Sequence, residues 1–134
     1  MATGKEKKRV LILDDDPDLI EALAGILADE GLEVHRRATR SVADVMALKP
    51  DLVMIDCPPG AKAEVLKFVQ QMRLNREIAG IPILLGLTST KLIEPDLLRE
   101  RSIEVLVRPF SIEELVSSVS HLLDVRQSKK SSAP

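Results

Sequence analysis

Residues 10–17 read Val10-Leu11-Ile12-Leu13-Asp14-Asp15-Asp16-Pro17, and this stretch decides the fold. Four consecutive apolar residues are typical of a short strand that is covered on both faces, as in a parallel sheet. An acidic residue directly before a proline favours a helix start, with Asp16 as the N-cap and Pro17 in the first turn. The stretch therefore predicts a strand, a turn carrying three carboxylates, and a helix.

Similar runs recur along the chain and extend this unit. Residues 52–55 and 83–85 are continuously apolar, whereas residues 32–35 and 102–105 alternate between apolar and polar. Alternation is typical of half-exposed strands, so the first, third and fourth strands are expected at the centre and the other two at the edges. Five strand–helix units predict an α/β fold: a flavodoxin-like doubly wound five-stranded parallel sheet, order 2-1-3-4-5, with five helices.

Apolar residues at helical spacing mark the segments between the strands. Three stripes are clear, formed by Leu19, Leu23, Ile26 and Leu27, by Val65, Phe68, Val69 and Met72, and by Ile112, Leu115, Val116, Val119, Leu122 and Leu123. Ser111 and Glu114 form a capping box before the last stripe. Two further helices are expected at residues 41–48 and 93–101.

Length and composition indicate one soluble domain. The 134 residues are 45% hydrophobic and 30% charged, with a net charge of −2. We expect an ordered domain at residues 9–125 between loose polar tails at 1–8 and 126–134. The absence of Trp and Tyr and of any long apolar run argues against nucleic-acid and membrane partners. A lone cysteine, Cys57, suits a reducing, cytoplasmic location.

Acidic residues end two strands that the predicted order makes neighbours. Asp14, Asp15 and Asp16 follow the first strand, and Asp56 ends the third. Carboxylates gathered this closely raise each other's pKa or require a cation, and Mg²⁺ prefers such oxygen ligands. The simpler alternative is helix capping, which one acid, Asp16, is expected to perform. That role leaves the other acids unexplained, so the sequence predicts a divalent-cation pocket.

Three motifs in order, LILDDDPDLIEAL, PDLVMIDCPPG and VLVRPFSIEEL, resemble the receiver domain of bacterial response regulators over residues 9–125. The resemblance implies that Asp56 accepts a phosphoryl group from a histidine kinase or phosphotransfer protein. It also implies that Asp14, Asp15, Asp56 and the backbone carbonyl of Pro58 hold Mg²⁺. It implies a signalling domain rather than a stand-alone enzyme. The signal would pass to a downstream target protein through residues 82–90 and 108–115, and the protein would be a monomer or weak homodimer.

The sequence departs from the family pattern near the phosphoryl site. Arg108 stands where a lysine is typical, and its bond to Pro109 is expected to be cis, as in the family. Leu87 occupies the place of a hydroxyl residue, and Thr88 comes one residue late. A bulge at Gly86 would restore Thr88 as the phosphoryl-binding hydroxyl; without a bulge that hydroxyl is missing.

Two further departures leave a second function open. Val105 replaces the usual aromatic residue of the fifth strand. The loop after Asp56 is shorter than the common pattern, and Pro58 and Pro59 would stiffen it and shift the carbonyl ligand. A degenerate receiver, acting as a phosphorylation-independent interaction module, is therefore the alternative. A flavin-binding protein is disfavoured because no glycine-rich loop follows the first strand. His35 and His121 are expected to have no functional role, and Cys57 to be a buried filler.

Overall fold

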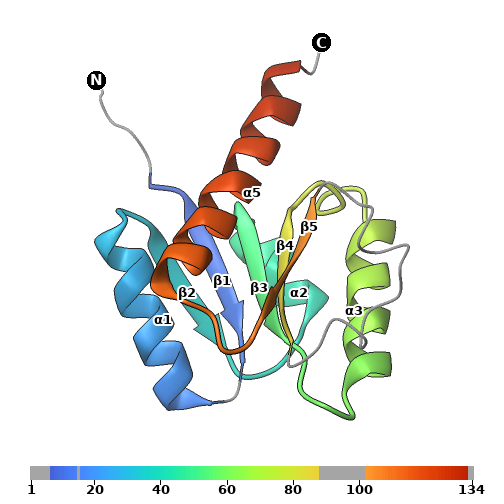
Figure 1. The fold of residues 1–134 in the computed structure, drawn as a ribbon. Coiled ribbons are helices and arrows are strands. Elements are labelled where there is room, and N and C mark those ends of the chain that lie inside the picture. Colours follow the sequence, from blue (N-terminus) through green and yellow to red (C-terminus); the bar gives the residue numbers. More distant parts are fainter. Residues whose placement is uncertain (1–6, 15, 88–101, 133–134) are drawn as a thin grey trace.

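The computed structural model describes residues 7–14, 16–87 and 102–132, with side chains as far as Arg126. These residues form a five-stranded parallel sheet in the order β2-β1-β3-β4-β5 (Figure 1). The predicted sheet order and the central position of the first, third and fourth strands are confirmed. The strands are β1 (Arg9–Leu13), β2 (Glu33–Arg37), β3 (Leu52–Asp56), β4 (Ile83–Leu87) and β5 (Ile103–Val107).

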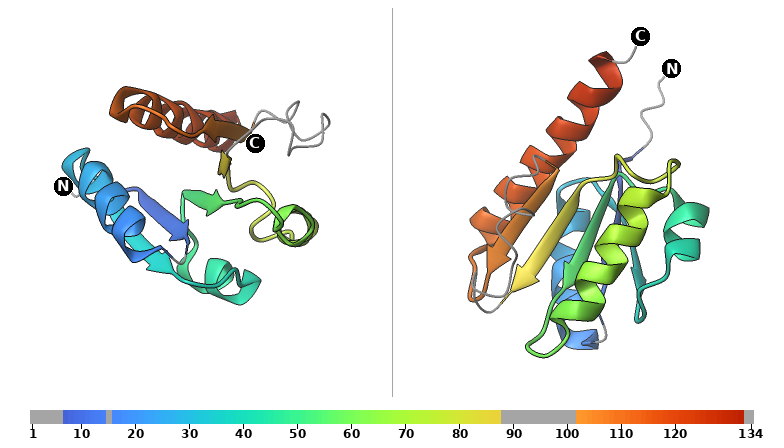
Figure 2. Two further views of the ribbon diagram at one scale, coloured as in Figure 1. Left: turned by 60° about the horizontal axis from the view of Figure 1, so that its bottom comes forward. Right: turned by 90° about the vertical axis from the view of Figure 1, so that its right-hand side faces the viewer.

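Helices cover both faces of the sheet, with α1 and α5 on one face and α2 and α3 on the other (Figure 2). The described part of the chain contains four helices: α1 (Pro17–Asp29), α2 (Val42–Leu48), α3 (Lys62–Leu74) and α5 (Ile112–Ser132). The fifth expected helix, at residues 93–101, lies outside the described residues. The architecture is thus the expected doubly wound one, and the described residues contain four of the five predicted helices.

Two apolar cores follow from the pleat of the central strands, because alternate side chains point to opposite faces. Leu11, Val53 and Leu85 pack toward α2 and α3, whereas Ile12 and Leu84 pack toward α1 and α5. These side chains are at most 2% exposed. Burial on both faces explains why the central strands are continuously apolar in sequence.

The predicted helix caps are present. The Asp16 carboxylate accepts hydrogen bonds from the backbone N–H groups of Asp18 (3.1 Å) and Leu19 (3.3 Å). Ser111 and Glu114 form the reciprocal capping box that starts α5, with bonds of 3.0 and 3.1 Å. Gly31 ends the α1 turn with a φ of +84°, a conformation that favours glycine.

The predicted C-terminal boundary is wrong, because α5 continues to Ser132 where residues 126–134 were expected to be a loose tail. Figure 1 shows this helix extending beyond the edge of the sheet. Arg126 anchors the extension through an ion pair of 3.4 Å to Asp51. Arginine, glutamine and lysine in this segment are also good helix formers, and the sequence prediction underrated them. No helix within the described residues is long and apolar enough to cross a membrane.

Candidate functional site

Asp14 and Asp56 lie at the same edge of the sheet, at the carboxyl ends of β1 and β3. Leu13 pairs with Ile55, so the two acids are the next residues along neighbouring strands. Their side chains are only 4% and 16% exposed. Parallel strand order alone accounts for this convergence, because neighbouring strands end at one edge. Two partly desolvated carboxylates so close together need a cation between them.

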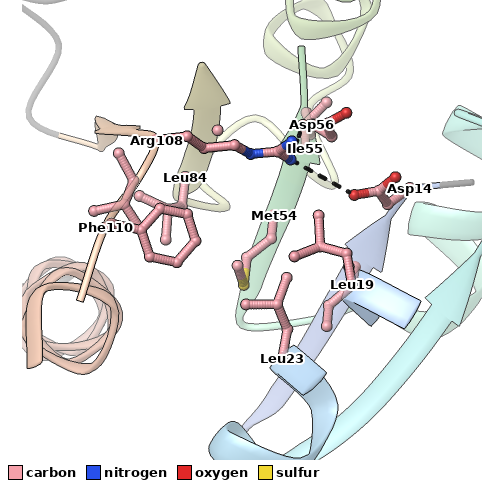
Figure 3. A pocket seen from close by; sticks show the side chains of 12 residues that line it. Asp14, Leu19, Leu23, Met54, Ile55, Asp56, Leu84, Arg108 and Phe110 are labelled. Carbon is pink, nitrogen blue, oxygen red and sulfur yellow. Dashed lines mark hydrogen bonds and ion pairs between the residues drawn. The ribbon is translucent and has the colours of Figure 1, made fainter. Parts of the chain in front are cut away.

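In the structure that cation is Arg108, the first residue after β5. Its Nη2 donates a hydrogen bond to Asp56 Oδ1 and also lies 3.9 Å from Asp14 Oδ2 (Figure 3). One guanidinium therefore bridges the two acids. The Arg108–Pro109 peptide bond is cis, as expected. Arg108 Nε is buried and has no hydrogen-bond partner among the described residues, so the guanidinium is held through its Nη2 end.

The turn after β1 fixes the orientation of Asp14. Asp14 Oδ1 accepts a hydrogen bond of 3.0 Å from the backbone N–H of Asp16, and Oδ2 faces Arg108. The backbone N–H of Asp14 donates to the carbonyl of Arg37 at the end of β2. One carboxylate oxygen is thus used by the turn, and the other is presented to the site.

A cavity of about 380 Å³ opens beside the two acids. Its walls come from the loops after β1, β2 and β3, and are formed by Leu13, Asp14, Ala38, Thr39, Arg40, Asp56, Pro58 and Ala61. The carbonyl of Pro58 accepts a turn hydrogen bond of 3.1 Å from the N–H of Ala61. A carbonyl oxygen has a second lone pair, so this bond leaves it able to bind a cation.

Oxygen donors of this kind fit Mg²⁺, which binds through one or two carboxylates and keeps several waters. The cavity leaves room for waters beside Asp14, Asp56 and Pro58. Asp15, the third predicted metal ligand, lies outside the described residues. Among the residues that the structure describes, no three His, Cys, Asp or Glu side chains form a group that could hold a metal.

The end of β4 carries no bulge within the described residues. Gly86 pairs with Asp56 on one side and Leu106 on the other, and Leu87 pairs with Val107. Leu87 is 1% exposed and belongs to the core beneath α2 and α3. The strand therefore contains no bulge as far as Leu87, and the bulge considered at Gly86 is wrong for this part of β4. An apolar side chain, that of Leu87, lies where the family pattern has a hydroxyl residue. Thr88 lies outside the described residues. Val105 is half-buried against the same core.

Gly86 lies beneath the ion pair between Asp56 and Arg108. A Cβ at this position would lie 3.8 Å from Asp56 Oδ1 and 3.9 Å from Arg108 Nη2, ordinary contact distances. A larger branched side chain would occupy the space through which the guanidinium reaches Asp56. Gly86 thus permits this long side chain to replace a lysine.

Gly86→Ala is expected to raise the free energy of unfolding by about 0.5 to 1 kcal/mol, because alanine restricts the unfolded chain and its Cβ fits without strain. Urea denaturation followed by circular dichroism measures the change. Gly80→Ala, on the loop before β4 with no atom near the added Cβ, is the matched control. A loss of more than about 1 kcal/mol in Gly86→Ala alone would contradict the contact geometry.

Three other residues singled out in the sequence lie apart from the acids. Cys57 is 2% exposed. Burial, followed by the charge of Asp56, raises the pKa of its thiol, while the charges of Arg40 and Lys62 lower that pKa. His35 contacts Glu33 (2.6 Å) on β2, and His121 pairs with Glu104 between α5 and β5. None of the three lines the cavity beside Asp14 and Asp56.

Arg40 is a residue of the site that the sequence did not indicate. It lies in the loop between β2 and α2 and forms part of the cavity wall. No local motif marks it, because the folded path of this loop brings it to the acids. The only signal in the sequence was a basic residue after the end of a predicted strand. Arg36 and Arg37 also fit that description, so it did not single out Arg40.

Comparison with known proteins finds similar sequences and structures, although no family model matches the chain. The DNA-binding response regulator MtrA of Mycolicibacterium smegmatis is 31% identical over 117 residues, which are 84% of this chain and 49% of the relative. A solved chemotaxis response regulator of Vibrio cholerae is 25% identical with a TM-score of 0.67, and 87% of this chain covers 99% of it. The relatives of this chain are thus response regulators, and its fold is that of a receiver domain.

The receiver is shared with proteins of different overall organisation. The hybrid signal transduction histidine kinase D of Dictyostelium discoideum is 29% identical over 127 residues, 92% of this chain but 8% of that protein. The chain spans about half the length of the mycobacterial relatives that it matches.

Proposed function

We propose that Asp56 accepts a phosphoryl group from a histidine kinase or a phosphotransfer protein, with Mg²⁺ held by Asp14, Asp15, Asp56 and the carbonyl of Pro58. The observation that supports this most directly is the placement of Asp56. It ends β3 beside Asp14, beneath the guanidinium of Arg108, and borders an open cavity. The receiver then acts through protein contacts.

The reaction needs little from the protein beyond positioning and charge neutralisation. An Asp56 carboxylate oxygen attacks the phosphorus, and a P–O bond forms as the P–N bond to the donor histidine breaks. The imidazole leaves with the electron pair of that bond and takes a proton. When bound, Mg²⁺ would neutralise the phosphoryl oxygens and so admit an anionic nucleophile. Hydrolysis by water would return Asp56 and inorganic phosphate.

Arg108 has two partners in turn under this proposal. Before the reaction it neutralises Asp56 and borders Asp14. After it, the same guanidinium binds a phosphoryl oxygen, for which its planar fork is well suited. Because Arg108 is only about a third exposed, this exchange occurs largely away from solvent screening.

The degenerate receiver is the second candidate, and two observations favour it. Leu87 supplies no hydroxyl for the phosphoryl group, and it is buried in the core. Arg108 already neutralises Asp56, which lowers the need for a metal ion. In that case the fold would bind its partner without modification of Asp56.

Exposed apolar side chains near the site support signalling by contact under either candidate. Val107, at the end of β5, is 36% exposed, and Ile112, in the first turn of α5, is 59% exposed. Val107 directly precedes Arg108 in the chain, and Ile112 follows it shortly. A change in the partner of Arg108 can therefore alter the positions of these two side chains. This region is our proposed surface for the downstream target.

The deciding experiment incubates the protein with Mg²⁺ and acetyl phosphate and measures its intact mass. The wild-type protein is expected to gain one phosphoryl group, Asp56→Asn to gain none, and chelation of the metal to prevent the gain. Asp29→Asn, which removes an exposed carboxylate at the far end of α1, is the control and should behave as wild type. No adduct on the wild-type protein, or one that persists in Asp56→Asn, would leave the degenerate receiver as the function.

A further inference from the structure

The two acids stand between two arginines. Asp14 and Asp56 line a small cavity of about 30 Å³ together with Arg108, which reaches them across β4 (Figure 3). The same two acids line the larger cavity, which contains Arg40 and does not contain Arg108. A phosphoryl group on Asp56 therefore has one arginine on the β4 side and a second on the side of the β2–α2 loop.

Arg40 is held in place by a weak contact. Its Nη2 lies 3.3 Å from Glu64 Oε2 in the first turn of α3, and the two side chains are 27% and 75% exposed. The loop itself is anchored by Ser41, whose hydroxyl caps α2 by accepting a hydrogen bond from Asp44. Exposed ion pairs contribute little to stability, so Arg40 can leave Glu64 for a stronger partner at low cost.

We propose that Arg40 is a second phosphoryl-binding residue, whose guanidinium exchanges Glu64 for the phosphoryl oxygens on Asp56. This inference rests on the proposed function and deepens it. Phosphorylation replaces the single negative charge of the Asp56 carboxylate by up to two on an acyl phosphate, and it places three strong acceptors beside the Asp14 carboxylate in this cavity. Among the described residues at the end of β4, Leu87 provides no hydroxyl, so Arg108 is the donor on that side and Arg40 is the donor on the side of the larger cavity.

The exchange also gives the loop after β2 and the start of α3 a part in the response. While Asp56 is unmodified, Arg40 links the β2–α2 loop to Glu64 on α3. Once Arg40 binds the phosphoryl group, Glu64 loses this partner. The β2–α2 loop is then tied to Asp56 rather than to α3.

The test measures the affinity for beryllofluoride, a phosphoryl mimic, in the presence of Mg²⁺ by ¹⁹F NMR. Arg40→Ala is expected to bind it about tenfold more weakly, as for one lost charge-assisted hydrogen bond. Glu64→Gln, which releases Arg40, is expected to bind it about two- to threefold more tightly. Arg40→Lys should recover part of the loss, and Arg76→Ala, an exposed arginine after α3, should match wild type.

The opposite changes in affinity expected for Arg40→Ala and Glu64→Gln distinguish a phosphoryl-binding arginine from one that only forms a structural ion pair. If the contact between Arg40 and Glu64 only supports the fold, both variants will change the affinity in the same direction, which overturns the proposal. Wild-type affinity in Arg40→Ala, with normal phosphorylation of the unaltered protein, overturns this inference alone. If the unaltered protein neither binds beryllofluoride nor gains a phosphoryl group, this inference and the proposed function both fail.

Discussion

Arg108→Met is expected to tighten Mg²⁺ binding about tenfold and to slow phosphorylation of Asp56 about a hundredfold. The two effects have one cause, because Arg108 contacts both acids and competes with a metal ion for them. Removing it frees the carboxylates to bind Mg²⁺. The same substitution removes a cation that would stabilise the phosphoryl group as its charge develops. Loss of one such donor typically lowers a reaction rate by about a hundredfold or more.

Titration calorimetry measures the Mg²⁺ affinity, and a time course of intact mass with acetyl phosphate measures the rate. Arg108→Lys should restore most of the rate, because it returns a positive charge to the place where the family carries one. Arg76→Met is the control for loss of an exposed arginine. Unchanged or weaker Mg²⁺ binding in Arg108→Met would show that the guanidinium does not compete with the metal.

Leu87→Thr is expected to lower the free energy of unfolding by about 3 kcal/mol and to speed phosphorylation of Asp56 several-fold. The stability is lost because Leu87 is 1% exposed, and threonine leaves a cavity and buries a hydroxyl. The rate gain is expected because residue 87 follows Gly86, the pairing partner of Asp56, and its carbonyl accepts a hydrogen bond from the backbone N–H of Arg108 (2.8 Å). A hydroxyl here restores the donor that the family pattern places at the end of β4.

Leu87→Val is the matched control, because valine has the shape of threonine and no hydroxyl. It should lower the free energy of unfolding by about 1 to 2 kcal/mol and leave the phosphorylation rate unchanged. Denaturation in urea gives the first quantity, and intact mass gives the second. Equal rates in the threonine and valine variants would mean that residue 87 does not reach the phosphoryl group.

The sheet and the placement of its two central acids could be predicted from the sequence, because both depend on local patterns. Continuous apolar runs identified the strands that are buried on both faces, and alternation identified the edges. Once the order was known, Asp14 and Asp56 had to end neighbouring strands. The caps at Asp16 and Ser111 are equally local, since each bonds to backbone groups within three residues.

Contacts between distant segments could not be predicted in this way. The sequence ended the last helix too early in part because the ion pair between Arg126 and Asp51 joins α5 to the residue before β3. The sequence also left open whether β4 contains a bulge at Gly86. The register of β4 with β3 and β5 excludes such a bulge as far as Leu87. Helix ends and strand registers are set here by partners that lie far away in the chain.

The sequence by itself determined the doubly wound sheet and the two carboxylates at its edge, because the side-chain periodicity of strands and helices is written in neighbouring residues. Only the tertiary structure decided which cations meet those carboxylates. Arg108 reaches Asp56 and Asp14 across Gly86, and Arg40 enters the cavity from the loop after β2. The directions of long side chains and loops depend on the space that the packed core leaves, which no local pattern records.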